Sequence, residues 1–253
     1  MTILNIKPGK VNKMILYQGK SLIDGQPIMA IAIKKSGNSK TGNMIQTYIM
    51  RSDIDPRDAS KTGADYSICG KCKHRGQATD DPGAKLAKNR SCYVVMGQGP
   101  TVVYKAYKRG TYPMANNSDD ISNFAQGRMV RLGTYGDPAA VPSYIWDSLL
   151  LKAKGHTAYT HQSDIKTADV RHDLFMTSAD SLQDARIAWQ NKRRTFRIIH
   201  VATEKQDNEI ICPATPAGGN KSDCSKCGLC QGAHVTAPSI AVIAHGNGAK
   251  YIH

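Results

Sequence analysis

The sequence predicts an α/β protein: a partial (β/α) barrel with an N-terminal antiparallel β extension and Cys-rich metal-binding loops. Three observations lead to this fold class. Strands and helices alternate from Cys92 onward, the first part of the chain has strands and turns only, and seven cysteines form two groups. Alternation of strand and helix is typical of a parallel sheet with crossover helices. The sequence has no GxGxxG turn, which favours a barrel over a dinucleotide-binding fold.

The N-terminal part contains three apolar runs separated by turn residues, among them Asp24-Gly25. We expect strands at Lys13 to Tyr17, Pro27 to Lys34 and Met44 to Arg51. Such a pattern predicts a β meander. We therefore divide the chain into a β extension over 1–55 and a part-barrel over 56–253, with metal sites at 69–92 and 212–230.

The repeating part begins with a short apolar run and continues with strands and two clear helices. Expected strands are Cys92 to Met96, Met129 to Leu132, His156 to Thr160, Leu174 to Met176, Thr195 to Val201, Ile210 to Ile211 and Ser239 to His245. Apolar residues recur at helical spacing in 141–152, and Ser181 is a suitable N-cap for a helix over 181–191. Ligands of such sheets and barrels bind at the carboxyl ends of the strands.

The composition limits the class of protein and its partners. The 253 residues contain no run of about 18 apolar residues, so no membrane span is expected. The first twenty residues lack a secretory pattern, so we expect a cytoplasmic protein. A net charge of +14 favours polyanions such as nucleic acids, although a generally basic surface explains the charge equally.

The second cysteine group comprises Cys212, Cys224, Cys227 and Cys230. The last three are each separated by two residues, as in the loops that bind ferredoxin-type clusters, and Cys212 supplies a fourth thiolate. Four thiolates are equally a structural zinc set. The group therefore predicts a closed metal site, with an iron-sulfur cluster and Zn both open.

The first group comprises Cys69, Cys72 and Cys92, with nineteen residues between the last two. Three thiolates suffice for a 4Fe-4S cluster with one iron left open. They also suffice for zinc, with His74 as the fourth ligand. If His74 fills that position, the pattern indicates a scaffold protein; if the position is open to a ligand, it indicates an enzyme.

The loop GTYGDP follows the strand around Met129 to Leu132. Gly133 and Gly136 permit close backbone approach, and the Asp137 carboxylate can accept a hydrogen bond from an amine. The same residues would also make an ordinary turn capped by Asp137. A ligand-binding loop and a plain turn both fit this pattern.

The strand, the Gly-x-x-Gly-acid-Pro turn and the helix after it resemble the GGEP segment of radical S-adenosylmethionine enzymes. That resemblance implies a part-barrel, a 4Fe-4S cluster on Cys69, Cys72 and Cys92, and an auxiliary cluster on the second group. It also implies that Gly133, Gly136 and Asp137 contact the methionyl group of S-adenosylmethionine. The chain departs from the family in lacking the CxxxCxxC run and in having Asp137 where Glu is usual.

A closer likeness is to uncharacterised Cys-rich proteins encoded by phages and plasmids. The segments GTYGDP, YTHQ, SADS, RTFRI and CSKCGLCQG carry it. It implies no particular activity.

Polar side chains stand at the ends of several predicted strands, where a barrel would gather them at one mouth. They are Tyr159, His161, Ser178, Asp180, Arg197, His200 and His245. We single out His161 and His245 as candidate catalytic residues because each follows an apolar strand directly.

Two functions follow from these patterns. One is an iron-sulfur enzyme that cleaves S-adenosylmethionine and acts on an unknown substrate, for which nucleic acid is the candidate class. The other is a zinc-stapled basic accessory protein of a phage or plasmid that binds DNA or RNA without catalysis.

Overall fold

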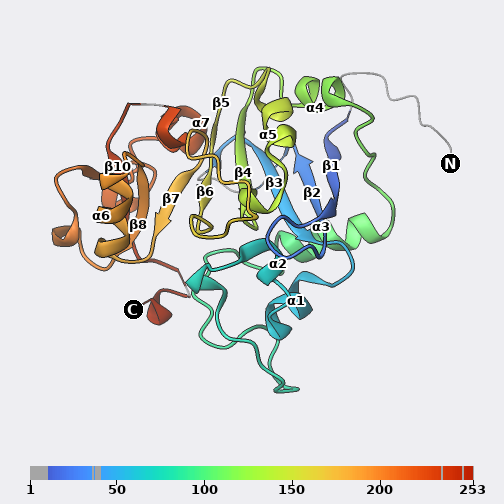
Figure 1. The fold of residues 1–253 in the computed structure, drawn as a ribbon, viewed down its shortest axis with the longest axis horizontal. Helices are drawn as coiled ribbons and strands as arrows, with labels where there is room; N and C mark the ends of the chain where they lie inside the picture. The colour runs from blue at the N-terminus through green and yellow to red at the C-terminus, as the bar shows by residue number, and fades with distance from the viewer. Residues whose placement is uncertain (1–10, 36, 38–40, 235, 247, 253) are drawn as a thin grey trace.

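The computed structural model describes residues 11–252 except 36, 38–40, 235 and 247. Over these residues the protein has a mixed α/β fold, as the sequence predicts. It contains two five-stranded sheets, with the strand orders β1-β2-β3-β4-β5 and β6-β7-β8-β10-β9. Figure 1 shows the two sheets following one another across the molecule.

The strands of the first sheet are β1 (Lys13–Lys20), β2 (Pro27–Ile33), β3 (Ile45–Arg51), β4 (Met129–Tyr135) and β5 (Gly155–Thr157). Those of the second sheet are β6 (Tyr159–Thr160), β7 (Met176–Ala179), β8 (Thr195–Ile199), β9 (Glu209–Ile211) and β10 (Ser239–Ile243). The α-helices of the described residues are α1 (Pro56–Thr62), α2 (Tyr66–Cys69), α3 (Pro100–Lys108), α4 (Ser118–Phe124), α5 (Ser143–Leu150), α6 (Leu182–Gln190) and α7 (Cys224–Cys227).

The first three strands form the predicted antiparallel meander, since β1 pairs with β2 and β2 with β3 in opposite directions. On its other side β3 pairs in parallel with β4, with Ile45 opposite Val130. Strand β3 is thus the last strand of the meander and the first of the parallel series. The carboxyl end of β3 leads into the segment that contains α1 and α2 (Figure 1).

Parallel pairing also joins β4 to β5, β6 to β7, β7 to β8, and β10 to both β8 and β9. This agrees with the parallel sheet expected from the alternation of strands and helices. The chain passes from one sheet to the other at Ala158, which separates β5 from β6. The Ala158 amide donates to the carbonyl of Cys230 at 3.0 Å. The second cysteine group is therefore bonded to the point where the two sheets meet.

One predicted strand is wrong. Residues 91–95 have no regular secondary structure, so the parallel series starts at β3 and not at Cys92 to Met96. The run is apolar in composition, but Tyr93 and Val95 are more than half exposed, at 56% and 57%. An apolar run of this length does not specify a strand when no neighbouring strand is available to pair with it.

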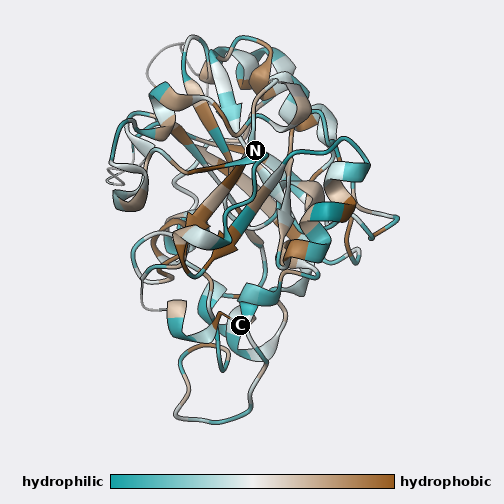
Figure 2. Cartoon of the chain, turned by 90° about the vertical axis from the view of Figure 1, so that its left-hand side faces the viewer, coloured by the Kyte–Doolittle hydropathy of each residue, from teal (hydrophilic) through white to brown (hydrophobic). Residues whose placement is uncertain are grey.

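The core lies between the sheets and the helices that cross them. Apolar strands occupy the middle of the molecule in Figure 2, with hydrophilic segments around them. In α5 the fully buried Trp146 donates its indole N–H to the carbonyl of Pro138 at 2.9 Å. Helix α6 begins as predicted, with the Ser181 hydroxyl accepting from the Asp184 amide. None of the described helices has the length and apolar character needed to cross a membrane.

A buried ion pair crosses the second sheet. The Arg197 guanidinium in β8 donates to both carboxylate oxygens of Glu209 in β9, at 2.9 and 2.5 Å. It reaches Glu209 across β10, where the small Ala241 lies opposite Arg197. The two side chains are only 6% and 0% exposed. Arg197, a strand-end polar residue in the sequence, therefore has a partner within the sheet.

Candidate metal centres

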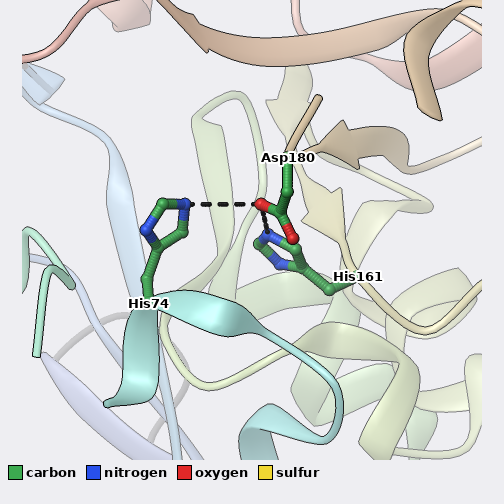
Figure 3. Close-up of side chains that lie close together, drawn as sticks. All are labelled: His74, His161 and Asp180. Atoms are coloured by element: carbon green, nitrogen blue, oxygen red, sulfur yellow. Dashed lines mark hydrogen bonds and ion pairs between the residues drawn. The ribbon is translucent and has the colours of Figure 1, made fainter. Parts of the chain in front are cut away.

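Three side chains from distant parts of the chain meet beside the carboxyl ends of the parallel strands. His161 follows β6, Asp180 follows β7, and His74 lies in the segment after β3. The Oδ1 atom of Asp180 is 3.2 Å from Nε2 of His161 and 3.5 Å from Nε2 of His74 (Figure 3). Both imidazoles thus point at the same carboxylate oxygen.

The Asp180 carboxylate and the His161 imidazole affect each other's pKa. Burial raises the pKa of Asp180, but the hydrogen bonds from His161 and His74 outweigh burial and hold it well below its usual value. For His161, burial lowers the pKa, but the Cys72 thiolate and Asp180 together raise it well above the ordinary value. The His161 imidazole is also hydrogen bonded to the Cys72 side chain. The first cysteine group therefore contacts the group formed by His74, His161 and Asp180.

The long loop between Cys72 and Cys92 folds back on itself. Gln77 and Lys88 form an antiparallel bridge with backbone bonds of 2.9 and 2.8 Å. The Cys92 amide then donates to the carbonyl of His74 at 2.8 Å. This turn brings the third cysteine, which is remote in sequence, beside the CxxC pair.

The thiols of the first group lie within electrostatic reach of one another. Burial raises the pKa of the Cys69 thiol well above its ordinary value, and Asp65 adds to the effect. Cys72 and Cys92 raise it further. A bound cation would stabilise such closely placed, partly buried thiols as thiolates.

His74 does not lie among these thiols as a fourth ligand. Its Nδ1 atom is 2.8 Å from the Ser91 hydroxyl, and its Nε2 atom faces Asp180. Both ring nitrogens therefore have partners outside the cysteine group.

Gly76 makes the fold-back possible. A Cβ atom there would lie 2.4 Å from the carbonyl oxygen of Lys88 and 2.9 Å from Cα of Arg90. Its φ of 81° and ψ of −167° belong to a region that only glycine occupies readily. Gly76 thus allows the two arms of the loop to touch.

We expect Gly76→Ala to weaken the first metal site and leave the second intact. The strain, about 1 to 3 kcal/mol, would fall on the contact that places Cys92. The measurement is metal content together with the number of thiols that react with a disulfide reagent. Gly83→Ala, in the same loop and 3.3 Å from a flexible Asp81 carboxylate oxygen, is the matched control. Equal metal content in both variants would contradict this role of Gly76.

The GTYGDP loop packs tightly against protein. A Cβ atom on Gly136 would lie 2.7 Å from the Ile49 carbonyl oxygen, and one on Gly133 would lie 2.5 Å from the Gly136 carbonyl oxygen. Asp137 is 7% exposed. Its carboxylate accepts from the amides of Ala139 and His161. Gly133, Gly136 and Asp137, which the resemblance implies as contacts to S-adenosylmethionine, thus make tight contacts within the protein. Gly136 packs against β3, and Asp137 accepts a hydrogen bond from the residue after β6.

Gln162, which sequence reasoning missed, connects this loop to the first cysteine group. Its Nε2 atom donates to Asp137 and to the carbonyl of Cys69, both at 2.8 Å. Its Oε1 atom accepts from the Lys71 amide at 3.2 Å. Only its position directly after His161 marked it in the sequence.

His245, the second predicted catalytic histidine, lies elsewhere on the same side. Its ring contacts Tyr93, with ring centroids 5.2 Å apart, and its Nδ1 atom is 2.7 Å from the Ile243 carbonyl oxygen. Tyr93 follows Cys92, so His245 is near the first cysteine group. The structure pairs His161 with Asp180 and His74, and not with His245.

The second cysteine group forms around Cys230. Burial, followed by the neighbouring thiols of Cys212, Cys224 and Cys227, raises the pKa of Cys230 to about 12. The Tyr159 hydroxyl, in β6, is hydrogen bonded to Cys230 and opposes that rise. Gly228 ends α7 in the left-handed conformation, with a φ of 62°. The thiols of Cys212, Cys224 and Cys227 thus lie within electrostatic reach of the buried Cys230 thiol.

Only one set of three candidate ligand atoms in the described part of the chain lies within 4.8 Å of one another, that of His74, His161 and Asp180. No three described thiols of either cysteine group lie this close to one another. Comparison with family models, with curated proteins and with solved structures gave no match to this chain.

Proposed function

We propose that the protein is an iron-sulfur enzyme with a radical-SAM-like part-barrel, in which Cys69, Cys72 and Cys92 hold a 4Fe-4S cluster. The observation that carries the proposal is the gathering of these three thiols beside the carboxyl ends of the parallel strands, with His74 turned toward Asp180. Three thiolates without a fourth protein ligand leave one iron open for a substrate.

The chain order of the parallel strands supports this proposal. Strands β3, β4 and β5 lie side by side in chain order in the first sheet, and β6, β7 and β8 do so in the second, with only Ala158 between β5 and β6. The cysteine segment follows the first of them and GTYGDP follows the second, as in the family that the sequence resembles. A sheet of this connectivity curves into a part-barrel when it closes.

The spacing of the thiols favours a cluster over one zinc ion. With zinc-sulfur bonds of about 2.3 Å, a tetrahedral site brings its thiolates within about 4 Å of one another. Neither cysteine group contains three described thiols within 4.8 Å. A cluster, whose thiolates are bonded to different iron atoms, accepts wider spacing. The same reasoning applies to an auxiliary cluster on the second group.

Tyr135 gives an independent sign that a group is missing beside the first cysteines. Its hydroxyl is buried and has no hydrogen-bond partner among the described residues. Burial raises its pKa well above the usual value, and Cys69 and Cys92 contribute to the rise, so the hydroxyl lies near these thiols. Buried hydroxyls are nearly always paired. A cluster sulfur would accept this hydrogen bond.

S-adenosylmethionine is the proposed co-substrate. A cluster held by these thiolates, once reduced by an external electron donor, would supply the one electron needed to cleave a carbon–sulfur bond of S-adenosylmethionine into methionine and a 5′-deoxyadenosyl radical. The chain's own contribution would be to hold the first cysteine segment against the GTYGDP loop through Asp137 and Gln162. Because the Asp137 carboxylate already accepts protein hydrogen bonds, we assign it to positioning this loop.

The experiment is anaerobic purification, followed by measurement of iron, sulfide and zinc and by reduction in the presence of S-adenosylmethionine. We expect a brown protein that contains iron and sulfide and releases methionine on reduction. Substitution of Cys69 should abolish that release. A colourless protein with stoichiometric zinc would overturn the proposal.

Tyr135→Phe provides a finer test. Removal of a hydroxyl that donates to a cluster sulfur should leave the iron content unchanged and make the reduction potential of the first cluster more negative. The potential is measured by redox titration followed by electron paramagnetic resonance. Tyr112→Phe, at a buried tyrosine that contacts Lys13, is the control. An unchanged reduction potential in Tyr135→Phe would mean that this hydroxyl does not donate to the cluster.

A second candidate function is the binding of a nucleic acid at the opposite ends of the strands. A hollow of about 390 Å³ lies there, lined by Trp189, Lys192, Arg193, Arg194, Asn208, Ala237, Pro238 and Ser239. Arg194 donates to the carbonyls of Gly232, Ala237 and Pro238, so Lys192 and Arg193 are the cations to test.

Binding of single-stranded DNA or RNA at this hollow should weaken steeply with salt, because cations displace counterions from phosphates. The double substitution of Lys192 and Arg193 by Gln should reduce the salt slope by about two. Substitution of Lys105 and Lys108 in α3, which removes the same charge, is the control. A binding affinity that does not change with salt concentration would exclude this function.

A further inference from the structure

The cluster of His74, His161 and Asp180 has the composition of a metal site in its own right. Two imidazoles and one carboxylate are suited to divalent ions of the first transition row, which imidazole nitrogen binds well. Their ligand atoms all lie within 4.8 Å of one another. Each comes from a separate part of the chain, so the fold and not local sequence brings them together (Figure 3).

Each histidine is held in place by a further contact. The Nδ1 atom of His74 is 2.8 Å from the Ser91 hydroxyl, which leaves its Nε2 atom directed at Asp180. The backbone amide of His161 donates to the buried Asp137 carboxylate at 2.8 Å. The contact of His74 is of the kind that commonly orients metal-binding histidines, a hydrogen bond on the other ring nitrogen, whereas His161 is held through its backbone.

The exposure of the three side chains suits an ion with free coordination positions. His74, His161 and Asp180 are 17%, 18% and 15% exposed. They are therefore shielded on most sides and still reachable from solvent. Catalytic metal sites typically have three protein ligands and an open position for water or substrate.

The three groups converge on one point. A carboxylate oxygen that faces two imidazole nitrogens can accept an N–H hydrogen bond from each of them, or the carboxylate and both nitrogens can share one bound cation. The alternatives are thus two N–H donors and a bound ion. A metal ion is a single partner that all three groups could contact at once, so it fits their convergence.

We propose that His74, His161 and Asp180 bind one divalent transition-metal ion at a site separate from the cysteine groups. The ion would sit next to Cys72, because His161 is hydrogen bonded to that residue. It would hold an oxygen or nitrogen atom of the substrate beside the first cysteine group. The site does not depend on what the thiols hold, so it stands whether they bind iron-sulfur or zinc.

Cobalt(II) is the probe, titrated into the full-length, anaerobically purified protein and followed by its absorption spectrum. Ligation by nitrogen and oxygen gives weak visible bands only, whereas thiolate ligation adds an intense near-ultraviolet band. We expect one equivalent of cobalt with the first kind of spectrum. His74→Ala and Asp180→Asn should each weaken this binding at least about tenfold.

Three controls keep the outcome decisive. His200→Ala, at an exposed histidine after β8, should bind cobalt as the unmodified protein does. Cys69→Ala should lose the cluster proposed for the first group but keep this ion, so the two proposals fail separately. Circular dichroism shows whether each variant is folded, and Asp180→Asn, which keeps the shape of the side chain, replaces His74→Ala if the latter is not.

Absence of cobalt binding in the folded protein would mean that His74, His161 and Asp180 are joined by hydrogen bonds alone. That result would overturn the proposal. A spectrum with the thiolate band only, or binding unchanged in both variants, would do so as well.

Discussion

Cys92→Ser is expected to lose about half of the bound iron and all S-adenosylmethionine cleavage, while the second cysteine group keeps its cluster. Cys92 reaches the first group only through the fold-back at Gln77 and Lys88, so no other cysteine of the chain is placed to replace it. The serine is close in size, and the fold should therefore survive. Iron and sulfide analysis with Mössbauer spectroscopy would measure the loss.

Two results would contradict this expectation. Retention of all the iron would show that Cys92 is not a ligand, and loss of all the iron would show that the two groups do not bind independently. Ser91→Ala serves as the neighbouring control, because Ser91 contacts His74 and no cysteine ligand is removed. It should keep both clusters.

Arg197→Met is expected to lower the free energy of unfolding by about 3 to 5 kcal/mol, because it leaves the Glu209 carboxylate buried without its partner. Glu209 is fully buried, and the amide of Gln206 is its other donor. Replacing both residues together, as Arg197→Met with Glu209→Leu, should recover most of the loss, since no unpaired charge then remains. Urea denaturation of the single and double variants measures both quantities.

The exposed ion pairs of Arg171 with Asp147 and Asp173 provide the comparison. Arg171→Met should cost less than about 1 kcal/mol, because water solvates the carboxylates that remain. A similar loss in Arg171→Met and Arg197→Met would mean that burial does not determine the effect.

Much of the fold could be predicted because its elements carry local signals. The meander strands alternate with turn residues, and Ser181 caps α6 with the bond that the sequence suggests. The strand expected at Cys92 to Met96 failed for a long-range reason. That segment is pinned by the bond from the Cys92 amide to His74 and has no strand beside it, and neither fact is visible in its composition.

The sequence predicts which cysteines belong together, but it does not predict which other side chains surround them. Thiol spacing along the chain marks possible ligands, because metal chemistry limits the spacing. The contact of His74 with Asp180 depends on how the segment after β3 packs on the ends of β6 and β7. The unpaired hydroxyl of Tyr135 is likewise a property of the packed protein, since tyrosine in a strand is ordinary.

The short strand β6 and the residue after it contact both cysteine groups, since Tyr159 is hydrogen bonded to Cys230 and His161 to Cys72. The strand has only two residues, and the bond from Ala158 to Cys230 holds it at its start. If both groups bind metal as proposed, a change at one group would therefore reach the other through this two-residue strand. Loss of metal from the second group should then alter the position of His161.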